Sequence, residues 1–288
     1  MLNNSHELTA WLLVGQRDAQ SADPERANLV LKSLNHYWAG DAHLRVVVTH
    51  ADSLSSSAGA YLDLELPNLS VELMSDTDLI GSDRVKKIAS TGWYRHQLVR
   101  ILGAGRVSDK SILMLDCDTF ATDYFDESVF LEDGKILSAW ESRDNKAWWA
   151  LSEKLFQTAG RKNSYGMLNT PNIVSGQHMD IVNQVVESQY ESVVGYLLGI
   201  LSTNLLSGDN PFTEYTYYSL WMEKLGFLSQ VHHDPKEKIL LITKNNIWDQ
   251  DTLLGITESD FEFTGMFSIV HGALDYSVTD LESIILKG

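Results

Sequence analysis

The sequence has little of several things that would indicate special classes of protein. Its 288 residues contain a single cysteine, Cys117, which cannot form an internal disulfide, and only five prolines. The most apolar run, Val193–Leu201, is far shorter than the roughly 20 residues of a membrane-spanning helix. The first residues lack the basic and apolar regions of a secretory signal peptide. We therefore expect a cytoplasmic protein without a membrane span, whose core needs no disulfide.

Positive charge is also scarce. There are 22 lysines and arginines against 39 aspartates and glutamates, which gives a formal net charge of −17. Such a chain repels phosphate polymers and anionic lipid surfaces, so we predict no nucleic-acid partner and at most a peripheral association with membranes. An anionic ligand would need local cations or a metal ion.

Apolar periodicity predicts strands that alternate with helices. The strands are expected at residues 8–14, 44–49, 71–74, 111–115, 135–140, 239–243 and 267–270, and the helices at 23–38, 93–102, 179–190 and 211–225. The second helix is expected to stop at Gly103 and Gly105. No internal repeat or linker interrupts the pattern. The alternation favours one α/β domain over residues 1–288, built on a mostly parallel sheet.

Two aspartates stand directly behind one of the predicted buried strands. The run Ser111–Leu115 is followed by Asp116, Cys117 and Asp118. Ligands of open α/β sheets bind at the carboxyl ends of strands. Two neighbouring carboxylates repel each other unless a cation compensates, so the pair indicates a hard divalent ion, Mn²⁺ or Mg²⁺, with positions open to substrate oxygens. The alternative is a pair of strand-terminal turn residues.

The same spacing occurs twice more in the chain. It recurs at Asp76 and Asp78 and at Asp249 and Asp251. Both of these pairs lie in polar, loop-like surroundings, where turn chemistry explains aspartate without a function. Only the central pair follows a predicted strand, and it is therefore the candidate site.

The segment Leu115–Thr119, behind a β-α-β opening, resembles the metal-binding motif of GT-A-type glycosyltransferases. Further segments resemble a poorly characterised branch of bacterial sugar transferases, namely Gly92–Leu98, Thr170–Asn172, Phe212–Tyr215 and the late His271. The resemblance implies a GT-A-like, Rossmann-like α/β fold with a mostly parallel central sheet flanked by helices. In it, residues 1–125 would hold the donor and residues 126–288 would shape the acceptor site.

The activity implied by this resemblance is metal-dependent transfer of a sugar from a nucleotide diphosphate sugar. UDP is the family's commonest nucleotide, and a hexosyltransferase is the class we expect. The acceptor would be a hydroxyl of a glycan or glycolipid. By analogy with bacterial transferases of this size, the protein would serve surface polysaccharide biosynthesis.

The resemblance also assigns roles around the metal. Asp118 would bind the ion directly, and Asp116 would bind the ion, the donor ribose or sugar hydroxyls. His271 follows an apolar strand and matches a late histidine that some members use as a third ligand. Neutral imidazole suits Mn²⁺ better than Mg²⁺. A strand-end histidine bonded to backbone is the alternative.

Donor contacts are expected at two further places. In this fold the nucleotide rests against the loop after the first strand, which makes Gly15 and Arg17 candidates. A basic cluster precedes the aspartate pair and could make charge-assisted contacts to the diphosphate. Its members are Arg84, Lys86, Lys87 and Arg95, of which Lys86 and Arg95 are the preferred candidates. Solvated helix faces would explain the same residues.

A carboxylate base is needed if the transfer inverts configuration. Glu214, in the first turn of a predicted helix, is the first candidate, and Asp209 is the second. An acidic residue that stabilises the helix N-terminus is the alternative explanation of Glu214. Trp140 and Glu141 could line the sugar pocket, since an aromatic face suits a pyranose.

Two other functions compete with a transferase. A nucleotidyltransferase normally carries a glycine-rich, basic loop behind its first strand, but this chain has only Gly15 and Arg17 there. A non-catalytic carbohydrate-binding or nucleotide-sugar-binding protein of the same fold would carry the same residues, because fold alone does not determine function.

Overall fold

The computed structural model describes most of the chain. The described residues are 8–14, 23–50, 64–91, 93–108, 110–144, 146–158, 164–168, 170–204, 210–235, 246–257, 265–271, 274 and 276–286. The chain divides into two compact units. Unit 1 comprises Met1–Ser75, Leu113–Phe130 and Leu241–Gly288, and unit 2 comprises Asp76–Ile112 and Leu131–Leu240.

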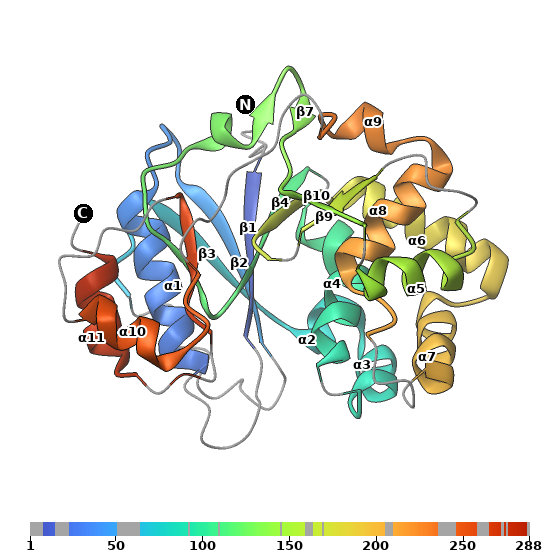
Figure 1. Cartoon of the computed structure of the whole chain (residues 1–288), viewed down its shortest axis with the longest axis horizontal. Helices are drawn as coiled ribbons and strands as arrows, with labels where there is room; N and C mark the ends of the chain where they lie inside the picture. Colours follow the sequence, from blue (N-terminus) through green and yellow to red (C-terminus); the bar gives the residue numbers. More distant parts are fainter. Residues whose placement is uncertain are drawn as a thin grey trace. The chain divides into compact units, whose positions relative to one another are not determined.

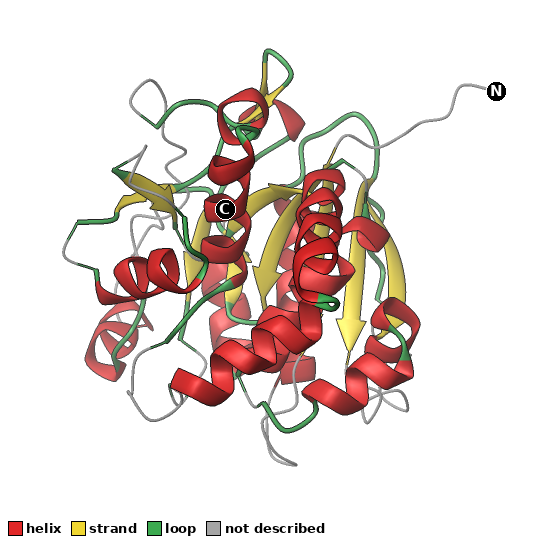
Figure 2. Cartoon of the chain, turned by 90° about the vertical axis from the view of Figure 1, so that its right-hand side faces the viewer, coloured by secondary structure: helices red, strands yellow, loops and turns green. Residues whose placement is uncertain are grey.

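The fold is mixed α/β and is built on a five-stranded sheet. Its order is β10 (Asn172–Ser175), β4 (Ser111–Asp116), β1 (Leu8–Val14), β2 (Leu44–His50) and β3 (Leu69–Ser75). The strands run side by side in Figure 2. The pairs β1–β2 and β2–β3 are parallel. The predicted fold class, a mostly parallel sheet with flanking helices, is confirmed.

Continuous apolar runs form the central strands, as their sequence predicts. Every residue of β1 is buried, and so is every residue of β2 except Arg45. The indole of Trp11 on β1 donates a hydrogen bond to the Thr49 hydroxyl on β2, at 2.8 Å. Strands that are covered on both faces need this composition, because neither face meets water.

Unit 1 adds helices and two short strands to β1, β2 and β3 and to most of β4. Its other elements are α1 (Asp23–Tyr37), β5 (Thr119–Ala121), a 3-10 turn at Glu127–Val129, α10 (Gln250–Thr257), β11 (Phe267–Ile269) and α11 (Val278–Ile285). Helix α1 packs against β1 and β5, and α11 packs against α1 (Figure 1). Strand β11 pairs antiparallel with β5, so a late segment of the chain lies beside the segment that follows β4.

Unit 2 is mainly helical. Its elements are α2 (Asp76–Ile80), α3 (Ser82–Ile88), α4 (Tyr94–Val107), β6 (Leu131–Glu132), β7 (Lys135–Ile136), β8 (Trp140–Ser142), α5 (Ala147–Leu155), β9 (Tyr165–Met167), β10, α6 (Gly176–Tyr190), α7 (Val193–Asn204), α8 (Glu214–Leu225) and α9 (Leu228–Val231). Helix α4 packs against α6 and α8. None of the described helices combines the length and the apolar character that crossing a membrane would require.

The predicted glycine stop of the helix after Trp93 is wrong. Helix α4 continues through both glycines to Val107. A Cβ on Gly103 would lie 2.6 Å from the Cδ2 of Leu79, and one on Gly105 would lie 2.1 Å from the Cγ of Asp180. These glycines therefore allow neighbouring side chains to approach the helix closely.

Three of the predicted strands have different outcomes. Residues 135–140 form the two short strands β7 and β8 instead of one, because β7 turns back on β6 as a hairpin and β8 pairs with β9. The strand predicted at 239–243 lies outside the described residues. The strand predicted at 267–270 is confirmed as β11.

Candidate functional site

The aspartate pair lies where β4 leaves the sheet. Asp116 is the last residue of β4, and Asp118 immediately precedes β5. Both are half-buried, whereas Cys117 between them is only 9% exposed. The Cys117 thiol donates a hydrogen bond to the carbonyl of Leu13 on β1, at 3.3 Å. This contact fixes the backbone that carries the two carboxylates to the end of the neighbouring strand.

His271 follows a segment that is bonded directly to the aspartate pair. Ile269 on β11 is paired with Thr119 on β5. One residue later, the amide of Val270 donates a hydrogen bond to the carbonyl of Asp118, at 2.9 Å. The backbones that carry Asp116, Asp118 and His271 therefore meet within unit 1.

These three residues offer oxygen and imidazole donors, which suit Mn²⁺ and, less well, Mg²⁺. Within the part of the chain that the structure describes, however, no three or more His, Cys, Asp and Glu side chains form a group arranged to hold a metal ion. Asp116, Asp118 and His271 are all described, so their side chains do not form such a group in this structure. Donor chemistry and backbone placement fit an ion that binds together with a substrate.

The structure describes only some of the residues that the sequence predicts at the nucleotide. Gly15 and Arg17 lie outside the described residues. Lys86 is exposed on α3, and Arg95 on α4 forms an ion pair with Asp76, which is only 2% exposed. Both basic residues belong to unit 2, whereas Asp116 belongs to unit 1.

Glu214 is held in a buried ion pair. Its Oε1 accepts a hydrogen bond from the Arg100 Nη1 at 2.7 Å, and the side chains of Arg100 and Glu214 are 1% and 2% exposed. The Glu214 amide donates to the Gln97 side-chain oxygen at 3.0 Å, and Thr213 caps α8 through a capping box with Thr216. This burial counts against Glu214 as a base that meets a sugar hydroxyl. Asp209 lies outside the described residues.

Glu141 is engaged in a second polar cluster of unit 2. It accepts a hydrogen bond from the Trp149 indole at 2.8 Å and pairs with Lys146. Nearby Trp140 is 7% exposed, so little of either side chain is available to a sugar.

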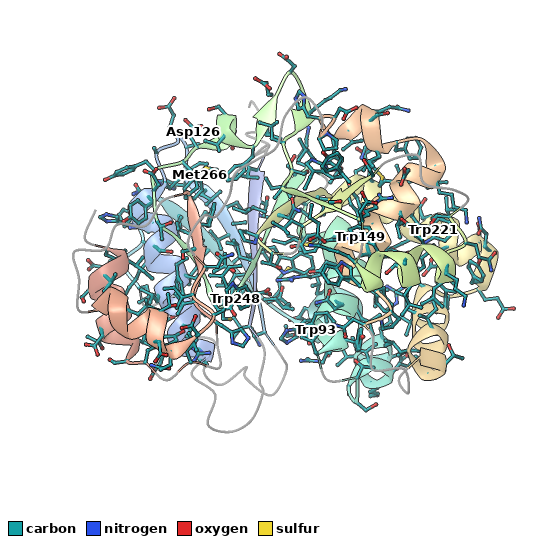
Figure 3. The ribbon with its side chains drawn as sticks, in the orientation of Figure 1. Trp93, Asp126, Trp149, Trp221, Trp248 and Met266 are labelled. Carbon is teal, nitrogen blue, oxygen red and sulfur yellow. The ribbon has the colours of Figure 1, made fainter. Side chains whose placement is uncertain are left out.

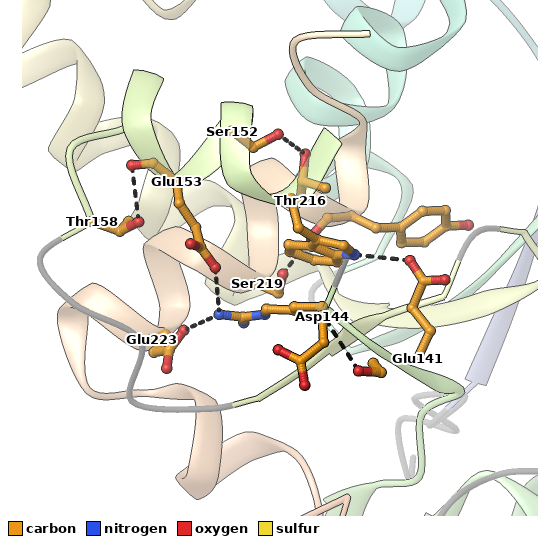
Figure 4. Close-up of polar contacts among 12 residues, drawn as sticks. Glu141, Asp144, Ser152, Glu153, Thr158, Thr216, Ser219 and Glu223 are labelled. Atoms are coloured by element: carbon orange, nitrogen blue, oxygen red, sulfur yellow. Dashed lines mark hydrogen bonds and ion pairs between the residues drawn. The ribbon is translucent and has the colours of Figure 1, made fainter. Parts of the chain in front are cut away.

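Arg143 is a buried residue of the same cluster, and sequence reasoning did not select it. It is 1% exposed, and its Nη1 lies 2.9 Å from the Glu223 Oε2 and 3.5 Å from the Glu153 Oε1 (Figure 4). Its guanidinium lies 4.8 Å from the centre of the Trp149 ring. A lone arginine behind a short strand carries no local signal of such burial, because its partners come from other elements.

His232 is a core residue of unit 2. It is 1% exposed, and its Nδ1 and Nε2 lie 2.8 Å and 2.9 Å from the hydroxyls of Ser138 and Tyr218. Burial, followed by the positive charges of His178 and His233, lowers the pKa of His232 to about 3. The imidazole is therefore neutral at ordinary pH and links α8 to the segment between β7 and β8.

Comparison with known proteins identifies the family. The model of the family described as "Family of unknown function (DUF6492)" matches residues 7–286. The chain belongs to this family. No curated protein sequence matches the chain.

Solved structures with a similar fold are glycosyltransferases. Mouse xyloside xylosyltransferase 1, in its apo form, has a TM-score of 0.51 at 12% identity, over 92% of this chain and 97% of its own. The galactosyltransferase LgtC, in complex with donor and acceptor sugar analogues, has a TM-score of 0.47 at 11% identity, over 92% and 87%. GlyE from Streptococcus pneumoniae has a TM-score of 0.40 at 14% identity, over 78% and 44%.

The first of these similarities spans nearly the whole of both chains and shows the fold. The resemblance to GT-A-type glycosyltransferases is therefore confirmed at the level of fold. At such low sequence identity, neither the roles of individual residues nor the substrate can be transferred to this chain, because one fold supports many functions.

Proposed function

We propose that this DUF6492 protein is a metal-dependent glycosyltransferase that moves a sugar from a nucleotide diphosphate sugar, with UDP as the nucleotide, to a hydroxyl acceptor. The observation that carries the proposal is the hydrogen bond from the Val270 amide to the Asp118 carbonyl. This bond joins the backbone leading to His271 to the aspartate pair at a strand end, in a fold shared with a known glycosyltransferase. Strand ends of this kind are where open α/β sheets bind ligands.

The residues of unit 1 would divide the work at the donor. Asp118 and His271 would hold a divalent ion, Mn²⁺ or Mg²⁺, and Asp116 would bind the ion or hydroxyls of the donor. Such an ion neutralises the charge of a diphosphate and of the departing nucleotide. Since the described side chains provide no closed group of three ligands, the donor's own phosphate oxygens would complete the coordination. This arrangement explains how a protein of net charge −17 could bind an anion.

The remaining donor contacts belong to this proposal as well. Gly15 and Arg17 would contact the nucleotide, and Lys86 and Arg95 would approach the diphosphate. Arg95 forms an ion pair with Asp76, whereas Lys86 is exposed on its helix, so Lys86 is the cation more accessible to a ligand. Residues 1–125 would serve the donor together with His271, and other parts of residues 126–288 would shape the acceptor site.

The proposed transfer also needs a catalytic base if it inverts configuration. Asp209 now stands ahead of Glu214, because Glu214 is buried against Arg100. A base has to come within hydrogen-bond reach of the hydroxyl that it deprotonates. The proposed setting is a cytoplasmic hexosyltransferase that acts on a glycan or glycolipid of a surface polysaccharide, with peripheral association at a membrane.

Calorimetric titration with UDP, with and without Mn²⁺, tests the donor site. Wild-type protein is expected to bind UDP only with Mn²⁺, and Asp118→Ala to weaken that binding by more than about 100-fold, since a direct ligand contributes several kcal/mol. Asp251→Ala is the matched control, because Asp251 is an exposed aspartate of the same unit in another Asp-x-Asp segment. Its binding should equal that of wild type.

Two outcomes would contradict the proposal. Equal binding by Asp118→Ala and wild type would show that the aspartate pair is not a metal site. Absence of binding by wild type to UDP, GDP, dTDP and CMP would remove the nucleotide-sugar donor altogether. Release of free sugar from a bound donor without an acceptor would separate a transferase from a protein that only binds the nucleotide sugar.

A further inference from the structure

An exposed tryptophan lies beside the proposed donor site. Trp248 in unit 1 is 57% exposed (labelled in Figure 3), although the preceding Ile247 is only 1% exposed. Burial of a large apolar side chain is favourable, and Trp248 forgoes much of that gain. Single exposed apolar side chains are common on protein surfaces, so it is the surroundings of Trp248 that distinguish it.

The backbone holds Trp248 next to His271. The Ile247 amide donates to the Ile269 carbonyl at 2.8 Å, and the His271 amide donates to the Ile247 carbonyl at 2.9 Å. The Trp248 and His271 rings lie 5.4 Å apart, centre to centre, with a tilt of 39° between their planes. His271 follows the residue whose amide bonds to Asp118. The indole therefore borders the same strand end as the aspartate pair.

We infer that Trp248 is the stacking platform for the pyranose ring of the donor sugar. The inference rests on the proposed function, because it takes the diphosphate to lie at Asp118 and His271. The transferred sugar is attached directly to the distal phosphate, whereas the base is separated from the phosphates by the ribose. An indole beside the imidazole of His271, the proposed metal ligand, would therefore meet the sugar before the base.

The chemistry of the two partners fits. A pyranose presents an apolar face of C–H groups, which packs against an aromatic face, and a rim of hydroxyls that stay in contact with polar groups. Trp248 offers the large aromatic surface, and half-buried Asp116 and Asp118 offer hydroxyl acceptors on the adjoining backbone. Discrimination among donor sugars would then depend on how each ring lies on the indole.

Unit 1 also supplies a matched control. Tyr124 is 59% exposed, and its ring is stacked with that of His36 at 6.3 Å. It is thus an exposed aromatic side chain beside a histidine, like Trp248. It follows the far end of β5, whereas Asp118 precedes the near end. Tyr124→Ala removes a comparable aromatic surface without touching the aspartate pair.

The test compares UDP with UDP-glucose and UDP-galactose in calorimetric titrations that contain Mn²⁺. Trp248→Ala is expected to weaken binding of the better UDP-sugar by about 3- to 10-fold, the value of an aromatic contact, and to leave UDP binding unchanged. Trp248→Phe retains an aromatic face and should restore most of the loss. Tyr124→Ala should bind both UDP and the UDP-sugar like wild type.

Fluorescence gives a second readout that is independent of activity. Acrylamide quenching of the Trp248 signal, taken as wild type minus Trp248→Phe, should fall when the UDP-sugar is added and stay unchanged with UDP. Circular dichroism spectra identical to that of wild type establish that the variants are folded.

Each contrary outcome has a distinct meaning. If Trp248→Ala weakens the binding of UDP and of the UDP-sugar equally, the indole contacts the nucleotide base, and the inference that it supports the sugar is wrong. Unchanged binding of both ligands would overturn any platform at Trp248. If wild type binds neither these ligands nor the GDP, dTDP and CMP sugars, the proposed function itself fails, and the inference fails with it.

Discussion

The acidic residues of the two units have different surroundings. In unit 1, Asp116 and Asp118 are half-buried at a strand end, one residue apart. In unit 2, Glu214 and Glu223 are each bonded to an arginine that is 1% exposed. Two carboxylates side by side favour an added cation, whereas a carboxylate that already faces a buried arginine has no need of one. The difference separates candidate ligands from residues that hold the fold together.

The buried ion pairs of unit 2 are kept together by the high cost of leaving one charge unpaired inside the protein. Removing one partner of a buried ion pair leaves an uncompensated charge inside the protein, which is far more costly than losing an exposed pair. Arg100 joins α4 to α8, and Arg143 joins the end of β8 to α5 and α8. These contacts bind separate elements of unit 2 together.

The largest effect is expected at Glu214. Glu214→Ala should lower the free energy of unfolding by about 3–5 kcal/mol, because it leaves the Arg100 guanidinium buried without its carboxylate. Urea denaturation followed by circular dichroism measures the change. The double variant Arg100→Met with Glu214→Leu should recover most of the loss, since it removes both charges and keeps the volume.

A different result at Glu214 would reverse its assignment. If Glu214→Ala keeps the stability of wild type within about 0.5 kcal/mol, the size of an ordinary surface substitution, and yet abolishes sugar transfer, then Glu214 acts as the base. Glu214 would then belong with Asp118 among the functional residues.

A medium effect is expected from the pH dependence at His232. The pKa of this imidazole is lowered from 6.5 to about 3 in the folded protein. Below pH 6.5 the unfolded chain therefore takes up a proton that the folded chain does not, and stability falls as the pH decreases towards 3. The expected loss between pH 7 and pH 5 is about 2 kcal/mol.

Urea denaturation at pH 7 and pH 5 measures this slope. His232→Gln removes the titrating group, so the difference between the two pH values should shrink by that amount. His43→Gln, at an exposed histidine, is the control and should retain the slope of wild type. An unchanged slope in His232→Gln would show that other groups dominate the acid response.

The smallest effect is expected at Asp249. Its carboxylate accepts hydrogen bonds from the amide and hydroxyl of Thr252, both at 2.8 Å, at the start of α10. The Thr252 amide first, and then its hydroxyl, lower the pKa of Asp249. At pH values above that pKa, Asp249→Ala should have a slightly lower melting temperature than wild type. The difference should disappear as the pH falls through the pKa.

Nucleotide binding should not change in Asp249→Ala. Calorimetry with UDP and Mn²⁺ beside Asp118→Ala makes the comparison direct, because both variants lose one aspartate of an Asp-x-Asp segment in unit 1. Loss of UDP binding in Asp249→Ala would show that helix capping is not the main role of this residue.

The order of the elements and much of the core could be predicted from sequence. Continuous apolar runs predicted β1, β2 and β4, and helical spacing predicted α1, because these patterns repeat within a few residues. The predicted helix stop at Gly103 was wrong, because this glycine makes room for the side chain of Leu79 on another helix and does not end its own helix. Local rules do not contain such contacts.

The candidate site divides in the same way. By itself the sequence determined that two aspartates follow a buried strand, because strand and turn preferences are local. It did not determine that Trp248 would stay exposed beside His271, or that Glu214 would face Arg100. Only the tertiary structure decided which carboxylate is paired with a buried arginine and which late segment bonds to the backbone of the aspartate pair. Burial and charge pairing depend on residues that are far apart along the chain, and these meet only when the chain is folded.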